Sequence, residues 1–516
     1  AGEAVATART DGFGRAEAAD LYLGSYLVRE VSAPRGYVLS EDEASFELSY
    51  AGQAVSVASA AVEFADVPAK GTIEFTKVDA ETGRVIPVAG TCARVTAAED
   101  IVTPDGTVRS RAGDVVAELV TDDSGRARSP ELYLGAYMVT ETIAVEPYVI
   151  NPEPKRVTLE YADQLTPVVS AGTEIGNVSA KGVIEIAKTD AETGRAIPVA
   201  GAEFDVMAKA DIVTPDGTLR AAAGEVVAEI ATGGDGKART PELYLGTYTV
   251  VERRAPEGYL LNAEEHDVEI AYEGQTVPVV LSGVEVGDAP AKGVIEVAKV
   301  DAETGLPVAA AGIGFDVYAA VDIVTPDGTV RAAKDTLVAS MSTDEAGCAQ
   351  TGALYLGSYY VRESRAPIGY VLSTEGVPVE LEYADQVTSI VVEGAAVANA
   401  PQKGVIEVAK VDAETGRAIP AAGTAFEVVA REDVVTGDGT LRAAAGEVVA
   451  EVETDDSGVA STPELYLGSY AVYERRAPEG YVLNGEPVVA NLDYAGQHVA
   501  VTSASTVVGD VPQKGV

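Results

Sequence analysis

The sequence predicts an all-β protein, a tandem array of small β-sandwich domains that together form an elongated rod. The first observation behind this prediction is an internal repeat with a constant period of 111 residues. The second is that apolar and polar residues alternate with the period of two that is typical of strands, with no convincing helical period. The third is that turns rich in Gly, Asp and Pro interrupt these runs at short intervals, as they do in small sandwiches.

Two sequence blocks and one dipeptide define the repeat. Asp-Ala-Glu-Thr-Gly begins at positions 79, 190, 301 and 412, and Leu-Tyr-Leu-Gly-x-Tyr begins at 21, 132, 243, 354 and 465. A Lys-Gly pair recurs at the same period and makes a natural boundary between units. The expected units are the second part of a repeat at 1–69, full repeats at 70–180, 181–291, 292–402 and 403–513, and the start of a further repeat at 514–516. We therefore expect the array to continue in both directions.

Within a repeat, the elements can be assigned in chain order, and repeat 181–291 serves as the example. The expected strands are 183–188, runs near 204–213 and 218–231, 243–252, and runs near 266–272 and 276–287. The expected turns are 190–194, 214–218 and 255–259. This pattern predicts a sandwich of seven or eight short strands. The stretch 287–293 leads directly into the next repeat, so linkers are almost absent and the array is stiff.

Composition excludes several classes of function. The 516 residues include 81 Asp and Glu against 37 Lys and Arg, and a net charge of -44 disfavours nucleic-acid binding. Hydrophobic residues make up 47% of the chain, but with 7 Phe and no Trp the cores must be small and aliphatic. No apolar run is long enough for a membrane span, so we expect no membrane insertion.

Neither cofactor nor metal is expected, and no conventional active site is found. With 2 His, and without a nucleophile elbow or a phosphate loop, the chain lacks the usual catalytic constellations. The acidic turns are better explained by turn chemistry than by calcium binding. The two cysteines, Cys92 and Cys348, lie at different repeat positions and are not expected to pair. We expect both to be buried as small apolar side chains.

Each repeat carries three polar residues on strand faces that are otherwise apolar. Residues i, i+2 and i+4 of a strand share a face, so Lys188 continues the apolar face of Ile184 and Ile186. The same reasoning places Glu252 and Asp288 on the apolar faces of two later strands. The equivalent residues are Lys77, Glu141 and Asn177; Lys299, Glu363 and Asn399; Lys410, Glu474 and Asp510; and, in the incomplete first unit, Glu30 and Asp66. Each full repeat is thus expected to bury one Lys, one Glu and one Asn or Asp.

The lysine column points to a reaction that needs an amine. Nine of the 13 Lys lie in two repeat columns, and none of the 24 Arg enters the first-strand column. Burial lowers the pKa of Lys and raises that of Glu or Asp. A neutral amine can then attack the side-chain carbonyl of Asn or Asp while a protonated Glu polarises it. Ammonia or water leaves and an isopeptide bond remains. A buried salt bridge without a covalent bond is the alternative that the residues leave open.

Two motifs and one position carry a resemblance to a known family. Residues 188–194 read Lys-x-Asp-x-x-Thr-Gly, residues 245–259 read Leu-Gly-x-Tyr-x-Val-x-Glu-x-x-Ala-Pro-x-Gly-Tyr, and Asp288 follows on the last strand. On these residues the unit resembles the B-type repeat domain of Gram-positive collagen adhesins and pilins, the Cna-B fold. That fold is an Ig-like, prealbumin-like β-sandwich, and the resemblance covers essentially the whole chain.

The resemblance implies one Lys–Asn or Lys–Asp isopeptide bond per full repeat, assisted by the acidic residue. The implied bonds are Lys77–Asn177 with Glu141, Lys188–Asp288 with Glu252, Lys299–Asn399 with Glu363, and Lys410–Asp510 with Glu474. Asp is a less usual acceptor than Asn in this family, and two repeats have it. Residues 144–148 of the second unit read Ala-Val-Glu-Pro-Tyr, so we expect a rearranged loop there. In unit 1–69, Asp66 lacks a lysine partner within this sequence.

These features predict a structural protein, a stalk or fibre segment of a Gram-positive cell-surface adhesin or pilus-like protein. Its expected location is extracellular, at the cell surface or wall, and its expected partners are adjacent repeats, with any host ligand bound by other regions. The boundary lysines are expected to be solvated beside the joints. The alternative is that the repeats themselves bind a host protein or glycan. An enzyme with turnover is not expected, since the crosslinking reaction occurs once per domain.

Overall fold

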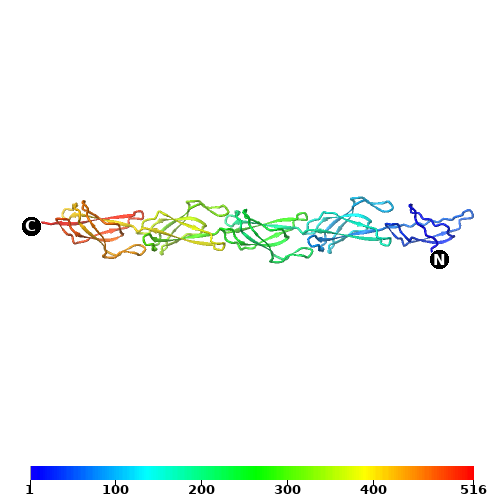
Figure 1. The fold of residues 1–516 in the computed structure, drawn as a ribbon, viewed down its shortest axis with the longest axis horizontal. Helices are drawn as coiled ribbons and strands as arrows, with labels where there is room; N and C mark the ends of the chain where they lie inside the picture. The colour runs from blue at the N-terminus through cyan, green and yellow to red at the C-terminus, as the bar shows by residue number, and fades with distance from the viewer. Residues whose placement is uncertain (1, 516) are drawn as a thin grey trace.

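The computed structural model describes residues 2–515, and these residues form an all-β chain without a helix. Five units follow one another end to end in a straight rod, with the two termini at its opposite ends (Figure 1). The prediction of a tandem array of sandwiches is therefore confirmed. Between residues 2 and 515 there is no helix that could cross a lipid bilayer.

Repeat 181–291 forms a two-layer sandwich. Its strands are β15 (Lys181–Asp190), β16 (Glu203–Ala208), β17 (Ile212–Val213), β18 (Leu219–Ala221), β19 (Val226–Ala231), β20 (Lys237–Arg239), β21 (Leu243–Tyr244), β22 (Gly246–Arg254), β23 (His266–Ile270) and β24 (Val279–Asp288). In the first sheet, β15 pairs antiparallel with β20 and β21 and parallel with β24. The second sheet has the order β19-β16-β22-β23, and β17 and β18 form a separate hairpin.

The other full repeats share this arrangement, and repeat 403–513 adds one short strand, Tyr481–Val482, that pairs with its last strand. Repeat 70–180 comprises β5 (Lys70–Asp79), β6 (Cys92–Ala97), β7 (Ile101–Val102), β8 (Val108–Ser110), β9 (Val115–Val120), β10 (Arg126–Arg128), β11 (Leu132–Tyr133), β12 (Gly135–Ile143), β13 (Lys155–Leu159) and β14 (Val168–Asn177). Repeat 292–402 comprises β25 (Lys292–Asp301), β26 (Gly314–Ala319), β27 (Ile323–Val324), β28 (Val330–Ala332), β29 (Leu337–Ser342), β30 (Cys348–Gln350), β31 (Leu354–Tyr355), β32 (Gly357–Arg365), β33 (Gly376–Leu381) and β34 (Ile390–Asn399). Repeat 403–513 comprises β35 (Lys403–Asp412), β36 (Ala425–Ala430), β37 (Val434–Val435), β38 (Leu441–Ala443), β39 (Val448–Glu453), β40 (Val459–Ser461), β41 (Leu465–Tyr466), β42 (Gly468–Arg476), β43 (Tyr481–Val482), β44 (Val488–Leu492) and β45 (Val501–Pro512).

Unit 1–69 contains only part of this fold. Its strands are β1 (Gly24–Arg29), β2 (Tyr37–Val38), β3 (Glu43–Leu48) and β4 (Val67–Pro68). They pair as β1 with β3 and β2 with β4, and Tyr26 stacks on Phe46 with ring centroids 5.5 Å apart. Side chains that would be core residues in a full repeat are therefore only half-buried here.

The structure divides the predicted runs more finely than the alternation indicated. The run near 204–213 is two strands, β16 and β17, and the run near 218–231 is β18 and β19. The second break follows from a turn at Gly224, whose φ of 77° lies in the left-handed region that glycine adopts without strain. Repeat 181–291 consequently has ten strands, some only two residues long, where seven or eight were predicted.

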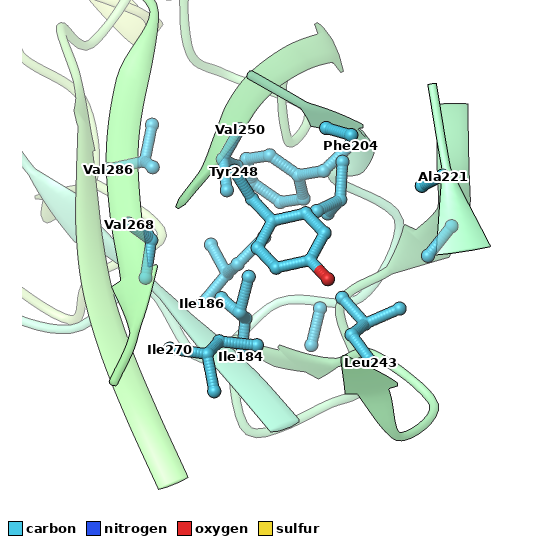
Figure 2. Packing of buried hydrophobic residues seen from close by; sticks show 14 of the residues in the cluster. Ile184, Ile186, Phe204, Ala221, Leu243, Tyr248, Val250, Val268, Ile270 and Val286 are labelled. Atoms are coloured by element: carbon cyan, nitrogen blue, oxygen red, sulfur yellow. The ribbon is translucent and has the colours of Figure 1, made fainter. Parts of the chain in front are cut away.

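Each sandwich has its own small core. In repeat 181–291 the ring of Tyr248 lies at the centre, surrounded by aliphatic side chains from both sheets, with Phe204 beside it (Figure 2). Gly182 of the boundary Lys-Gly pair is required by this packing. A Cβ at that position would lie 2.2 Å from Cγ2 of Ile270 on the facing sheet. At this position the facing sheet leaves no room for a side chain larger than glycine.

The cysteines differ from the prediction of burial. Cys348 is exposed and Cys92 is half-buried, and neither forms a disulfide. Cys348 begins β30, a strand of three residues in which only the central Ala349 faces the core. Its side chain points outward, because neighbouring residues of a strand face opposite sides.

Candidate functional site

The predicted polar side chains of repeat 181–291 come from three strands of both sheets. Lys188 lies on β15, and Asp288 is the last residue of β24, its parallel neighbour. The register pairs Lys188 with Val286, so Asp288 is two residues further along and faces the same side of the sheet. Glu252 on β22 approaches from the facing sheet. The parallel pairing of the first and last strands thus brings residues 100 positions apart into contact.

In the two repeats with Asp, the lysine contacts both carboxyl groups. Nζ of Lys188 lies 2.7 Å from Oε1 of Glu252 and also contacts Oδ1 of Asp288. The Lys410 amine lies 2.6 Å from Oε1 of Glu474 and contacts Asp510 in the same way. The side chains of Lys188, Glu252 and Asp288 are fully buried, with 0% of each exposed. Water is thus excluded from the cluster.

In the two repeats with Asn, the side-chain amide contacts both the amine and the carboxylate. Lys77 donates a hydrogen bond to Oδ1 of Asn177, whose Nδ2 donates to both oxygens of Glu141 at 3.0 and 2.9 Å. Nζ of Lys77 is itself 2.8 Å from Glu141. The carbonyl of the amide therefore faces the nucleophile, and the nitrogen that would leave as ammonia faces the acid.

Repeat 292–402 has a looser version of this arrangement. Lys299 donates to Oδ1 of Asn399 and to the carbonyl oxygen of Val397, the latter at 2.6 Å. Its Nζ is 3.7 Å from Oε1 of Glu363. Nδ2 of Asn399 still donates to Glu363, at 2.7 Å. The order amine, amide and carboxylate is the same in both Asn repeats.

Burial shifts several of these groups toward their neutral forms. Desolvation lowers the pKa of Lys299 to about 8 against the opposing effect of Glu363, and it also lowers the pKa of Lys77. Desolvation raises the pKa of Glu252 to about 7, and the nearby charge of Asp288 adds to the rise. Burial also raises the pKa of Asp288. Burial therefore favours a neutral amine in the two Asn repeats and protonated carboxyl groups in repeat 181–291.

A backbone amide that the sequence did not reveal holds the carboxylate in place. Oε2 of Glu252 accepts a hydrogen bond of 3.1 Å from the backbone N–H of Asn262, ten residues further along. The Asn262 side chain donates to the carbonyl oxygen of Gly287, next to the acceptor residue. Asn151 and Asn484 make the same pairs of bonds in their repeats, whereas Ser373 supplies only the backbone bond. The only signal in the sequence was this column of Asn.

An aromatic ring covers the lysine in two of the repeats. Nζ of Lys188 lies 5.7 Å from the ring centroid of Phe204, and Nζ of Lys410 lies 5.9 Å from that of Phe426. Repeat 70–180 has Ala93 in this column. Lys77 is therefore buried without that ring.

The loop of repeat 70–180 for which a rearrangement was expected has a cis peptide bond between Glu146 and Pro147, but its tyrosine contact is the same as in the other repeats. Tyr148 is fully buried, and its hydroxyl donates to Oδ2 of Asp79 at 3.1 Å. Tyr259 makes the equivalent bond to Asp190, at 3.0 Å. The tyrosine determines the course of the loop, so the change in the preceding residues leaves its contact intact.

Unit 1–69 contains two of the three groups. Glu30 accepts a hydrogen bond from the backbone N–H of Ser40 at 3.1 Å, as its counterparts do in the full repeats. Burial raises the pKa of the Asp66 carboxyl, and the nearby Glu30 adds to the rise. The unit has no lysine before Lys70. Within residues 2–515 no group of three or more His, Cys, Asp or Glu side chains could hold a metal ion.

The fold and the buried cluster together define a class, the tandem repeat proteins built from prealbumin-like sandwiches. This chain belongs to the SpaA family of prealbumin-like fold domains, which matches residues 1–60, 71–174, 182–283, 293–395 and 404–506. The predicted resemblance to Gram-positive pilin-type repeat domains is thereby confirmed. No curated protein matches the chain.

Solved structures of a TIE protein and of two pilins resemble the chain at low sequence identity. The TIE protein of Bacillus anthracis is 18% identical with a TM-score of 0.43, over 86% of this chain and 74% of that one. BcpA, the major pilin subunit of Bacillus cereus, is 16% identical with a TM-score of 0.24, over 64% and 100%. The shaft pilin SpaA of Lactobacillus rhamnosus GG is 16% identical with a TM-score of 0.18, over 44% and 99%.

Proposed function

We propose that this chain is a stalk or fibre segment of a Gram-positive surface adhesin or pilus-like protein, with each full repeat closed by one isopeptide bond. The observation that supports the bond is the buried contact between the lysine amine and the Asn or Asp side-chain oxygen in all four full repeats. In each case a buried glutamate lies within 3.7 Å of the same amine. The proposed location is the cell surface or wall, and the proposed role is structural.

The reaction follows from the geometry. The neutral Nζ of the lysine attacks Cγ of Asn or Asp. In the Asn repeats the glutamate accepts from the amide nitrogen and so lies beside the leaving group. In the Asp repeats a protonated glutamate shares a hydrogen bond with the acceptor carboxyl and polarises its carbonyl. The neutral amine loses one proton as the new C–N bond forms, and that proton departs with the leaving group. In the Asn repeats the old C–N bond breaks and ammonia leaves, whereas in the Asp repeats a C–O bond breaks and water leaves. Confinement in a dry core supplies the effective concentration that such a slow reaction needs.

A bond at this position determines how a repeat carries tension. Force enters through the first strand and leaves through the last, and these two strands are parallel neighbours. A covalent link from Lys299 to Asn399 would carry the force directly between the two strands, so the 100 residues of chain between them would not be under tension. The domain then transmits the load without unfolding, which is what a stalk that resists shear requires.

Single-molecule stretching of the full chain tests this proposal. The wild-type chain should extend without unfolding steps from its four full repeats. Lys299→Ala should add one step, in which the 100 residues between the anchor points release about 350 Å at ~3.5 Å per residue. Lys334→Ala in the same repeat is the matched control and should add none. Four unfolding steps in the wild-type chain would contradict the covalent closure.

The lowered pKa of Lys299 predicts how a repeat without the bond responds to pH. Glu363→Gln should prevent bond formation and leave Lys299 buried. The ordinary pKa of Lys is 10.5, and the folded pKa of Lys299 is about 8 while the charge of Glu363 raises it. Without that charge the folded pKa is lower, so the unfolding free energy of this repeat should rise with pH from below about 8 to about 10.5.

Chemical unfolding of the Glu363→Gln chain at a series of pH values measures this slope. Adding Lys299→Met in the same background removes the titrating group and should flatten it. A slope that survives Lys299→Met would mean that other groups cause it.

The repeated tyrosines do not favour the alternative of a ligand-binding array. In the four full repeats, Tyr248 and its counterparts are in the cores, and Tyr244 and its counterparts contact the neighbouring repeat or their own. Aromatic anchors for a ligand need to be accessible.

A further inference from the structure

The joint between repeats 181–291 and 292–402 contains a cluster of charged and polar side chains, which we call the acidic clamp. It consists of the turn Asp190–Gly194 of the first repeat and Lys292, Arg331 and Tyr355 of the second. Glu192 accepts from Lys292 and from Tyr355, both at 2.7 Å, and lies 3.1 Å from Arg331. One glutamate of the turn is thus bound by three groups of the following repeat.

Asp190 is the buried centre of the clamp. Its Oδ2 accepts from Nη2 of Arg331 at 2.7 Å and from the hydroxyl of Tyr259 in its own repeat. Its Oδ1 accepts from the backbone N–H groups of Glu192 and Thr193 and so fixes the turn. Arg331 thereby joins the two acidic residues of the turn with one planar fork, a geometry that lysine cannot reproduce.

A second set of contacts crosses the same joint. The side-chain Oε1 of Gln386 accepts a hydrogen bond from the backbone N–H of Ala255 at 3.0 Å. The main-chain carbonyl oxygen of Gln386 accepts one from the backbone N–H of Leu261 at 2.9 Å. The hydroxyl of Tyr383 donates to the carbonyl oxygen of Tyr259 at 3.1 Å. These contacts involve a different loop of each repeat, so the joint is held at two places.

The clamp recurs at every joint between full repeats. Arg220 and Arg442 bind Asp79 and Asp301 at 3.0 and 3.2 Å. The joint between 1–69 and 70–180 has only the second contact set, in which Gln164 binds Ala33 and Leu39. There Arg109 reaches Asp105 of its own repeat at 3.7 Å and its side chain is 28% exposed, against 9% for Arg331. The buried position of this arginine therefore depends on the acidic turn of a preceding repeat.

We propose that the acidic clamp is a specific docking interface between successive repeats, and that its arginine holds them in one orientation. The opposite faces of a repeat are complementary, since one presents the Asp and Glu of the turn and the other presents Lys, Arg and Tyr. The boundary lysines were expected to be solvated, but four of them bind the acidic turn of the preceding repeat and belong to this interface: Lys181, Lys292, Lys403 and Lys514. The inference goes beyond the proposed function and does not depend on the isopeptide bonds, because the clamp residues lie outside the crosslinking clusters.

Distances between two spin labels in the full chain, measured by electron–electron double resonance, test the proposal. With Cys92→Ser and Lys237→Cys, spin labels on positions 237 and 348 lie one period apart on the two sides of this joint. The starting chain should give a narrow distance distribution. Arg331→Ala should broaden this distribution, because the second repeat loses the side chain that binds both Asp190 and Glu192 of the first repeat. Unfolding curves should show that both repeats remain folded.

Two further variants make the result decisive. Glu192→Gln removes a charge on the first-repeat side of the clamp and should also broaden the distance distribution. The test therefore does not depend on whether the Arg331→Ala variant folds. Arg362→Ala is the matched control, because Arg362 stacks on Tyr318 and Tyr360 of its own repeat. It should leave the distribution unchanged. An unchanged distribution in both clamp variants, or equal broadening by Arg362→Ala, would overturn the proposal.

Discussion

The intact chain should weigh about 70 Da less than its sequence, because its two Asp-type bonds each release water (about 18 Da) and its two Asn-type bonds each release ammonia (about 17 Da). The expectation follows from the identity of the acceptors, Asp288 and Asp510 in two repeats and Asn177 and Asn399 in the others. Mass spectrometry of residues 1–516 under denaturing conditions measures the deficit. A noncovalent cluster would contribute no deficit under these conditions.

Single substitutions assign the deficit to particular repeats. Lys188→Arg keeps the positive charge but removes the amine, and should restore one water, whereas Lys77→Arg should restore one ammonia. Lys209→Arg, at an exposed lysine of repeat 181–291, should leave the deficit unchanged. A wild-type mass equal to that of the plain sequence would rule out the bonds. The clusters would then be buried ion pairs and hydrogen bonds.

Loss of the bond should cause the largest change in stability that a single substitution can produce in these repeats. Lys188 and Asp288 are 100 residues apart, and by analogy with a disulfide, constraining a loop of this length stabilises the fold by about 4.7 kcal/mol. Lys188→Ala removes that constraint and also leaves Glu252 and Asp288 buried without their cation, which adds to the loss. Calorimetry of the full chain should therefore resolve one repeat that melts well below the others.

Two controls separate the effect of the covalent bond from that of the charge. Glu252→Gln keeps the lysine and a side chain of similar shape, and should also yield a low-melting repeat because the reaction is no longer assisted. Lys209→Ala removes an exposed ion pair with Asp267 and should cost less than about 1 kcal/mol. If Lys188→Ala melted like Lys209→Ala, the constraint would be absent.

Alternation along the strands was enough to identify the three core-facing polar columns, because a period of two determines the face of each side chain. It could not reveal Asn262, whose backbone amide reaches Glu252 across a loop with no periodicity. The outward orientation of Cys348 was also missed, because a strand of three residues has too few positions to indicate a face. The acidic clamp was beyond prediction for a third reason. Arg331 and Asp190 are 141 residues apart in different domains, so only their relative placement brings them together.

The parallel pairing of first and last strands also makes the array a molecular ruler. The chain enters a repeat at one end of β15 and leaves from β24 at the other end, and β25 begins after three connecting residues. Ten residues of strand and this short connection, at about 3.3 Å per residue, advance the rod by roughly 40 Å per repeat. Gain or loss of a 111-residue unit would change the reach of the protein by one such step, so the number of repeats would measure its length.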